Sequence, residues 1–125
     1  MMDVLIESTK KFEKDIAKLS EHEKEIAIRK INGCAELFIV DKPNVYRKLK
    51  PLRIHLNGYD SSLYTMKISL KLIVVLTIDE DPIFGQVIFT LFRIVKHDDL
   101  DKAYKGVVES LYQDMHYQER EIVLV

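Results

Sequence analysis

The stretch Lys71–Val95, KLIVVLTIDEDPIFGQVIFTLFRIV, decides the fold. It contains two apolar runs rich in β-branched and aromatic residues, separated by Asp79–Gly85 (DEDPIFG). Such runs predict strands, and an intervening segment with proline and glycine predicts a turn. Upstream, Ser62–Ser69 (SLYTMKIS) alternates in hydropathy, which predicts a strand with one buried face. The three runs together predict an antiparallel meander.

The N-terminal residues predict a strand and two helices. Residues 3–8 (DVLIES) are typical of a short initial strand. Phe12, Ile16 and Leu19 follow at helical spacing. Ser20 and Glu23 have the spacing of a capping box, which predicts that a second helix begins after a tight turn. The expected apolar face of that second helix consists of Ala27 or Ile28, Ile31, Cys34 or Ala35, and Phe38.

A final helix is expected after the meander, with Asp98 or Asp99 as its cap and apolar residues at helical spacing from Leu100 to Tyr112. The tail at 116–125 ends in an apolar run that either pairs as a strand or stays loosely ordered. The predicted fold class is therefore α+β, in which an N-terminal helical hairpin packs on a small antiparallel sheet and a C-terminal helix follows.

Length and composition predict one domain spanning residues 1–125. The chain has 125 residues, of which 47% are hydrophobic and 31% charged, a globular composition. Its single cysteine, Cys34, excludes an internal disulfide and a cysteine-based zinc site. The histidines are too far apart in sequence to suggest a local metal site, and we expect no cofactor. Apolar runs are too short for a membrane span and no signal peptide is visible, so we expect a cytoplasmic protein.

The net charge of −1 conceals a basic block. Residues 42–71 contain seven lysines and arginines and one acid, Asp60, which gives a local charge of +6. Such a block is typical of a phosphate-binding surface, and the competing interpretation is a solvated basic loop. The basic residues are Lys42, Arg47, Lys48, Lys50, Arg53, Lys67 and Lys71.

Several short strings, in this order, resemble the RelE/ParE-like toxins of bacterial toxin–antitoxin pairs. Residues 12–19 (FEKDIAKL) are similar to the family's opening helix, and Tyr46–Leu52 (YRKLKPL) is similar to its basic connector. Residues 63–68 (LYTMKI) resemble the strand that follows, and Arg93–Tyr104 (RIVKHDDLDKAY) resembles the entry into the terminal helix. The resemblance spans about residues 3–112.

The resemblance implies a toxin that cleaves mRNA without a metal, free or on the ribosome, and that a small antitoxin neutralises. Two alternatives stay open: a protein of the same fold that has lost catalysis and only binds RNA or an antitoxin, and a ParE-type inhibitor of DNA gyrase. Active relatives commonly carry an arginine at the start of the central strand, where this chain has Lys71-Leu72. We therefore expect this arginine to be missing, or Lys71 or Arg93 to replace it.

An RNA strand is cleaved when its own 2′-hydroxyl attacks the adjacent phosphate. This reaction requires a base, an acid and cations that neutralise the charge on the phosphorane. His97 is the best candidate acid or base, because imidazole titrates near neutrality; the alternative is a helix-start histidine beside Asp98 or Asp99. Tyr104 either stacks on a base or belongs to the core. The predicted catalytic residues are His97, Lys71, Arg93 and Tyr104, and the predicted RNA-binding residues are Arg47, Lys48, Lys50, Arg53 and Lys67.

Overall fold

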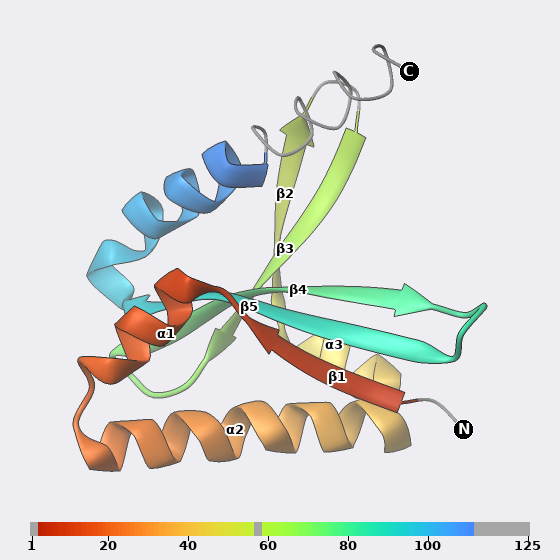
Figure 1. Cartoon of the computed structure of the whole chain (residues 1–125), viewed down its shortest axis with the longest axis horizontal. Coiled ribbons are helices and arrows are strands. Elements are labelled where there is room, and N and C mark those ends of the chain that lie inside the picture. Colours follow the sequence, from red (N-terminus) through yellow and green to blue (C-terminus); the bar gives the residue numbers. More distant parts are fainter. Residues whose placement is uncertain (1–2, 57–58, 112–125) are drawn as a thin grey trace.

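The structure is a computed structural model that describes residues 3–56 and 59–111 (Figure 1). Its N-terminal half forms β1 (Asp3–Ser8), α1 (Lys10–Ala17), α2 (Glu21–Val40) and α3 (Lys42–Lys48). The rest forms β2 (Lys50–Leu56), β3 (Tyr59–Lys67), β4 (Leu72–Asp81), β5 (Gln86–Lys96) and the 3-10 turn η1 (His97–Asp99), followed by a helix over 100–111. The predicted tail at 116–125 lies outside the described residues.

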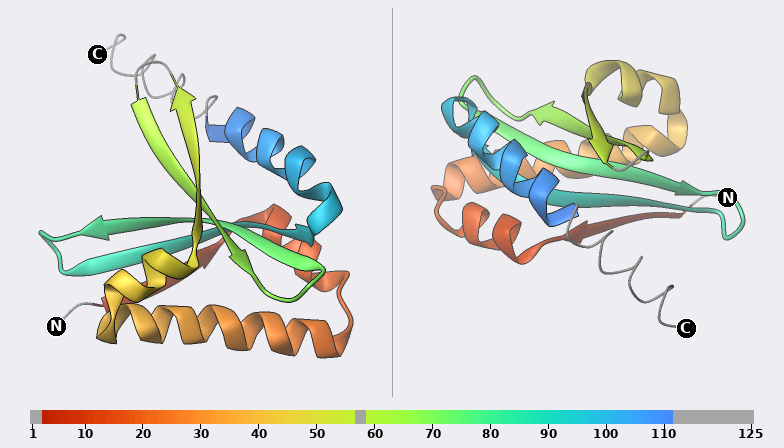
Figure 2. Two further views of the ribbon diagram at one scale, coloured as in Figure 1. Left: turned by 180° about the vertical axis from the view of Figure 1, so that it is seen from behind. Right: turned by 90° about the horizontal axis from the view of Figure 1, so that it is seen from above.

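The five strands form one mixed sheet in the order β1-β5-β4-β3-β2. Strands β2 to β5 are an antiparallel meander, and β1 pairs in parallel with β5. Figure 2 shows that the β2–β3 hairpin turns away from the plane of the other strands. The predicted α+β class is confirmed, but the expected antiparallel sheet is mixed because the first strand joins it in parallel.

Local hydrogen bonds explain where the first two helices begin. The Thr9 hydroxyl accepts from the Phe12 amide at 3.2 Å and caps α1. Ser20 and Glu23 form the predicted capping box, each side chain accepting the other's backbone N–H at 3.2 Å. The two helices pack mainly on other elements rather than on each other, since α1 contacts β5 while α2 contacts β1 and α3.

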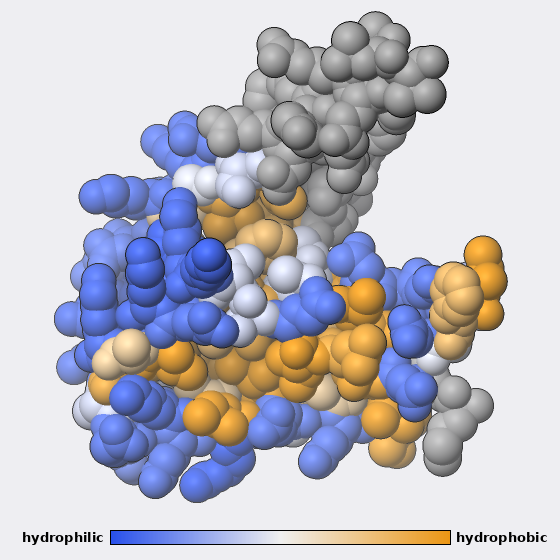
Figure 3. All heavy atoms as spheres, viewed as in Figure 1, coloured by the Kyte–Doolittle hydropathy of each residue, from blue (hydrophilic) through white to orange (hydrophobic). Residues whose placement is uncertain are grey.

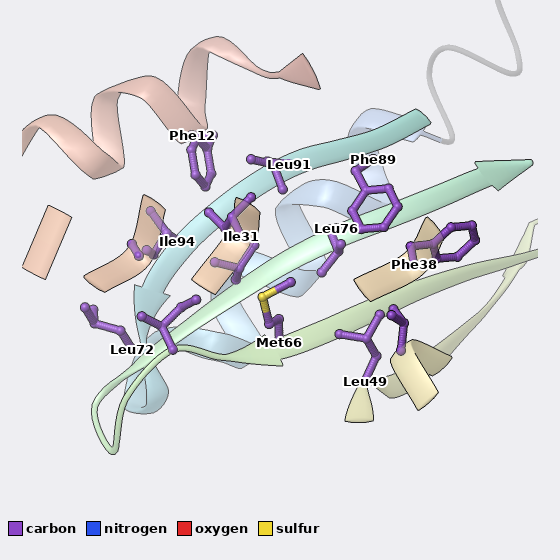
Figure 4. Packing of buried hydrophobic residues seen from close by; sticks show 14 of the residues in the cluster. Phe12, Ile31, Phe38, Leu49, Met66, Leu72, Leu76, Phe89, Leu91 and Ile94 are labelled. Atoms are coloured by element: carbon purple, nitrogen blue, oxygen red, sulfur yellow. The ribbon is translucent and has the colours of Figure 1, made fainter. Parts of the chain in front are cut away.

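The sheet carries a core on each of its two faces. The larger core lies between the sheet and α1, α2 and α3, where Phe12, Ile31 and Phe38 meet Phe89 and Leu76 (Figure 4). The smaller core lies under the helix over 100–111 and includes Leu63, Val75 and Val107. Strand alternation separates the two cores, since the neighbours Val74 and Val75 belong to different clusters.

Two local predictions were wrong. The expected basic connector Tyr46–Leu52 is instead the end of α3 and the start of β2, because proline in the first turn and apolar contacts of Val45 favour a short helix there. Asp98 and Asp99 lie within η1, directly before the final helix, and among the described residues neither side chain makes a capping hydrogen bond. The 3-10 turn places these acids at the first turn, where carboxylates suit the positive end of the helix dipole.

Candidate functional site

Four strand ends at one end of the sheet carry basic residues. Lys50 begins β2, and its ladder partner Thr65 lies two residues before Lys67, which ends β3. Lys71 directly precedes β4, and Lys96 ends β5. Neighbouring strands lie ~4.8 Å apart, so the backbones of β3, β4 and β5 are close together at this end. We call Lys50, Lys67, Lys71, Lys96 and His97 the basic end.

His97 and Lys71 are adjacent at the basic end. The His97 backbone N–H donates to the Lys71 carbonyl at 2.8 Å, which joins η1 to the loop before β4. Both side chains are exposed. Among the described residues, the His97 imidazole has no hydrogen-bond or ion-pair partner, so the contact with Asp98 or Asp99 that the alternative interpretation implies is not formed there. The geometry thus leaves an imidazole accessible beside a lysine.

Arg93 is held by α1 rather than presented to the basic end. Its Nε and Nη2 donate to the two Asp15 carboxylate oxygens at 2.6 and 3.0 Å. The same carboxylate accepts a hydrogen bond from the Ile94 backbone N–H at 3.2 Å. Asp15 thus binds the backbone of β5 beyond the point where its pairing with β1 ends. The bonded Asp15 raises the pKa of Arg93. This bidentate pairing identifies Arg93 as a structural link between α1 and β5, in contrast to its predicted role as a transition-state cation.

We expect Asp15→Asn to lower the free energy of unfolding by roughly 1.5–3 kcal/mol, the range for hydrogen bonds to charged groups. Asp15 is 11% and Arg93 25% exposed, so the substitution leaves a half-buried guanidinium without its counter-charge. Urea unfolding at neutral pH measures the loss. Glu13→Gln, on the same helix but exposed, is the matched control and should be nearly neutral. Equal stability of the two variants would contradict the assignment.

Glu23 is an acid close to the basic end. Its capping-box bonds with Ser20 lower the pKa of the Glu23 carboxyl, and the charges of Lys96 and Lys71 lower it further. Glu23 also lines a hollow of about 590 Å³ between the start of α2, the end of β5 and the final helix, together with Lys18, Lys96 and Lys102. The acid limits the net positive charge at this corner.

Tyr104 and Leu72 both belong to cores. Tyr104 is half-buried and packs against the smaller core with Leu63 and Val107, which agrees with the second of its two predicted roles. Leu72 is 2% exposed in the larger core. The position at which the sequence resemblance implies an arginine is thus occupied by a core residue, while Lys71 beside it is exposed.

The remaining predicted RNA-binding residues are divided between two elements. Arg47 and Lys48 are exposed in the last turn of α3, and Lys48 shares a hollow with Lys67 of β3. Arg53 lies on β2 opposite Ser62, and its side chain is outside the described residues. The structure therefore brings Lys48, Lys50 and Lys67 together in one region.

Three basic residues near these sites were missed in the sequence. Lys96 and Lys102 lie outside the basic block and among acids, and Lys30 is on α2, far from the block in sequence. Lys30 nevertheless lines the same hollow as Lys48 and Lys67. No local charge pattern predicts this, because the contact depends on how α2 packs on α3 and β3.

No family model, curated protein or solved structure matches this chain. Within residues 3–56 and 59–111, no helix is long and apolar enough to cross a membrane. The same part of the chain contains no group of three or more histidine, cysteine, aspartate or glutamate side chains placed to hold a metal ion.

Proposed function

We propose that this chain is the toxin of a RelE/ParE-like toxin–antitoxin pair and that it cleaves mRNA as an endoribonuclease without a metal. The observation that carries the proposal is that basic strand ends lie at the same end of the sheet as the exposed His97, whose backbone N–H bonds to Lys71. A positive surface with an accessible imidazole has the groups that cleavage by the RNA's own 2′-hydroxyl requires.

The order of the elements supports the family proposal. A first strand, consecutive helices, an antiparallel meander and a final helix occur in the order that the sequence resemblance implies. Compared with the implied order, the chain has one more helix, α3, and one more strand, β2, at the start of the meander.

In the proposed reaction, the 2′-oxygen attacks the adjacent phosphorus, and the bond from phosphorus to the 5′-oxygen breaks. One product ends in a 2′,3′-cyclic phosphate and the other in a 5′-hydroxyl. Lys71, which is adjacent to His97, neutralises the charge that develops on the phosphorane. The neutral His97 imidazole takes the proton of the 2′-hydroxyl as the 2′-oxygen attacks, and the imidazolium formed gives this proton to the leaving 5′-oxygen.

The proposed antitoxin covers the basic end and pairs with the open edge of the sheet. Strand β1 is an edge strand, with Leu5 41% and Ile6 40% exposed. Figure 3 shows hydrophobic surface over this region and at the β4–β5 turn, where Ile83 and Phe84 are exposed. An exposed apolar edge strand is a template for a strand from another chain.

A second candidate function is RNA binding without cleavage. Two observations favour it: Leu72 is buried at the position expected for an arginine, and Arg93 is engaged by Asp15. Both remove a guanidinium from the basic end and leave lysines there. Lysine neutralises phosphate as a point charge but lacks the planar fork of arginine.

Translating ribosomes incubated with purified protein distinguish these functions. Cuts in the message with 2′,3′-cyclic phosphate ends support the endoribonuclease. RNA binding without cuts supports the second candidate. Inhibition of DNA supercoiling by gyrase, with no effect on RNA, would contradict both and favour the ParE-type alternative.

Replacing both Lys48 and Lys50 by alanine should weaken RNA binding to all sequences alike, because phosphate contacts carry no base information. If each lysine contacts one phosphate, the slope of log affinity against log salt should flatten by ~1.4, since each contact on a single strand contributes ~0.7. Fluorescence anisotropy with a 2′-O-methyl oligouridylate, which lacks the attacking hydroxyl, measures binding alone. Lys10 and Lys11, exposed at the start of α1, form a matched double-alanine control. A slope equal to that of this control would contradict the assignment.

A further inference from the structure

A hollow of about 340 Å³ lies where α2, α3 and β3 meet. Lys30, Gly33, Cys34 and Leu37 line it from one face of α2, at the i, i+3, i+4 and i+7 spacing of a helical stripe. Val45, Lys48 and Leu49 line it from α3 and the residue that follows, and Met66 and Lys67 from β3. The volume is at the low end of the ~300–1,000 Å³ typical of small-molecule sites, which suits one small ligand group.

The charges around this hollow all have one sign. Lys30, Lys48 and Lys67 line it, and none of its lining residues among the described part of the chain is acidic. The hollow of about 590 Å³ differs in charge, because its lining includes the acids Asp15, Glu23 and Asp99. Three lysines in a lining without carboxylates favour an anionic ligand.

The floor of the hollow is apolar and contains two sulfur atoms. Cys34 is half-buried, and burial raises the pKa of its thiol while the charge of Lys48 opposes this rise. Met66 is 7% exposed and packs in the larger core. A thioether makes favourable contacts with aromatic rings. The floor therefore suits a planar aromatic group, and the rim suits the phosphates attached to it.

Lys67 connects this hollow to the basic end, because it belongs to both. A nucleotide bound in the hollow would therefore lie beside RNA bound at the basic end. We propose that the hollow binds one nucleotide of single-stranded RNA, with its base over Cys34 and Met66 and its phosphates at Lys30, Lys48 and Lys67. This inference rests on the proposed RNA-binding function, to which it adds a base-accepting subsite and the residue Lys30.

Cys34 is the only cysteine in the chain and so reports directly on the hollow. Its reaction with Ellman's reagent is followed with and without a 2′-O-methyl oligouridylate. At an RNA concentration ten times Kd, about a tenth of the protein is free, so the reaction should slow ~10-fold. Inorganic polyphosphate at equal phosphate concentration should protect Cys34 less, because it has no base to place over the thiol.

Lys30→Ala should flatten the salt dependence of RNA affinity by ~0.7, the contribution of one phosphate contact on a single strand. Arg29→Ala is the matched control: it removes one exposed charge from the adjacent position of α2, outside the hollow, and should leave the slope unchanged. Gly33→Leu places a side chain in the hollow and should weaken RNA binding. Gly33→Ala keeps the hollow open, since an added Cβ meets nothing within 4 Å.

Support for the subsite requires both Cys34 protection by RNA and the Lys30-specific change in slope. If the parent binds RNA but either effect is missing, the subsite is wrong and the RNA-binding proposal stands. If polyphosphate or poly-L-glutamate protects Cys34 as strongly as RNA, the hollow recognises charge or an acidic protein, and the nucleotide assignment is overturned. If the parent binds no RNA at all, both proposals fail.

Discussion

His97→Ala is expected to slow RNA cleavage by ~10²–10⁴-fold, the usual contribution of a general acid or base, while RNA affinity stays close to that of the parent. The side chain is exposed, so its removal should not destabilise the fold. Its backbone N–H, which bonds to the Lys71 carbonyl at 2.8 Å, is retained in the variant. Single-turnover cleavage of a labelled RNA, together with anisotropy on its 2′-O-methyl analogue, separates the two effects.

Asp98→Ala is the matched control, because it alters an exposed neighbour within the same η1 turn and should keep cleavage within a few-fold of the parent. If His97→Ala cleaves as fast as the parent, His97 is only a residue at the start of the helix. If the parent binds RNA and never cleaves it, the second candidate function, RNA binding without cleavage, is correct.

Phe89→Ala is expected to lower the free energy of unfolding by ~3–5 kcal/mol, the range for a phenylalanine removed from a core. The Phe89 ring is fully buried and meets Phe38 edge to face, with centroids 5.5 Å apart and planes at 88°. This contact joins β5 to α2 across the larger core. The loss is a large part of the ~5–15 kcal/mol that stabilises a typical domain.

Ile88→Ala is the matched control, since Ile88 is the half-buried neighbour on the opposite face of β5. We expect it to cost ~1 kcal/mol. Urea unfolding with an unchanged m-value measures both losses. Phe89→Leu retains most of the buried volume and keeps the comparison possible if Phe89→Ala does not fold. A larger loss for Ile88→Ala than for Phe89→Ala would mean that the register of β5 is wrong.

The elements with strong local signals could be predicted from the sequence. Residues 72–81 and 86–96 form strands because their β-branched and aromatic side chains suit a pleated, buried surface, and the segment with Pro82 and Gly85 turns between them. Gly85 adopts a φ of 63°, which only glycine tolerates readily. Ser20 and Glu23 mark the start of α2 because both capping bonds are local.

The elements that depend on distant partners could not be predicted. The direction of β1 follows from its pairing with β5, some 80 residues away in sequence. Within β5, periodicity alone does not reveal that Phe89 rather than Ile88 faces α2. The side that faces the helices depends on the register and on the irregularity of the ladder between Val75 and Leu76, which are tertiary properties.

The candidate site shows the same division. Its residue types are visible in the sequence, because a block with a charge of +6 is unusual in a chain with a net charge of −1. The role of each cation is not visible in the sequence, because the fold decides which charges are paired and which are exposed. The acids nearest to Arg93 in the sequence are Asp98 and Asp99, yet its hydrogen-bond partner is Asp15 of α1, at 2.6 Å.

The sequence by itself thus determined the α+β class, most of the element order and the presence of a basic surface, since hydropathy period, capping pairs and charge density act between near neighbours. Only the tertiary structure decided the parallel pairing of β1, the capture of Arg93 by Asp15 and the meeting of Lys30 with Lys48 and Lys67. These features require segments far apart in the chain to approach within bonding or packing distance. That approach depends on how the side chains of the two cores pack on opposite faces of one sheet.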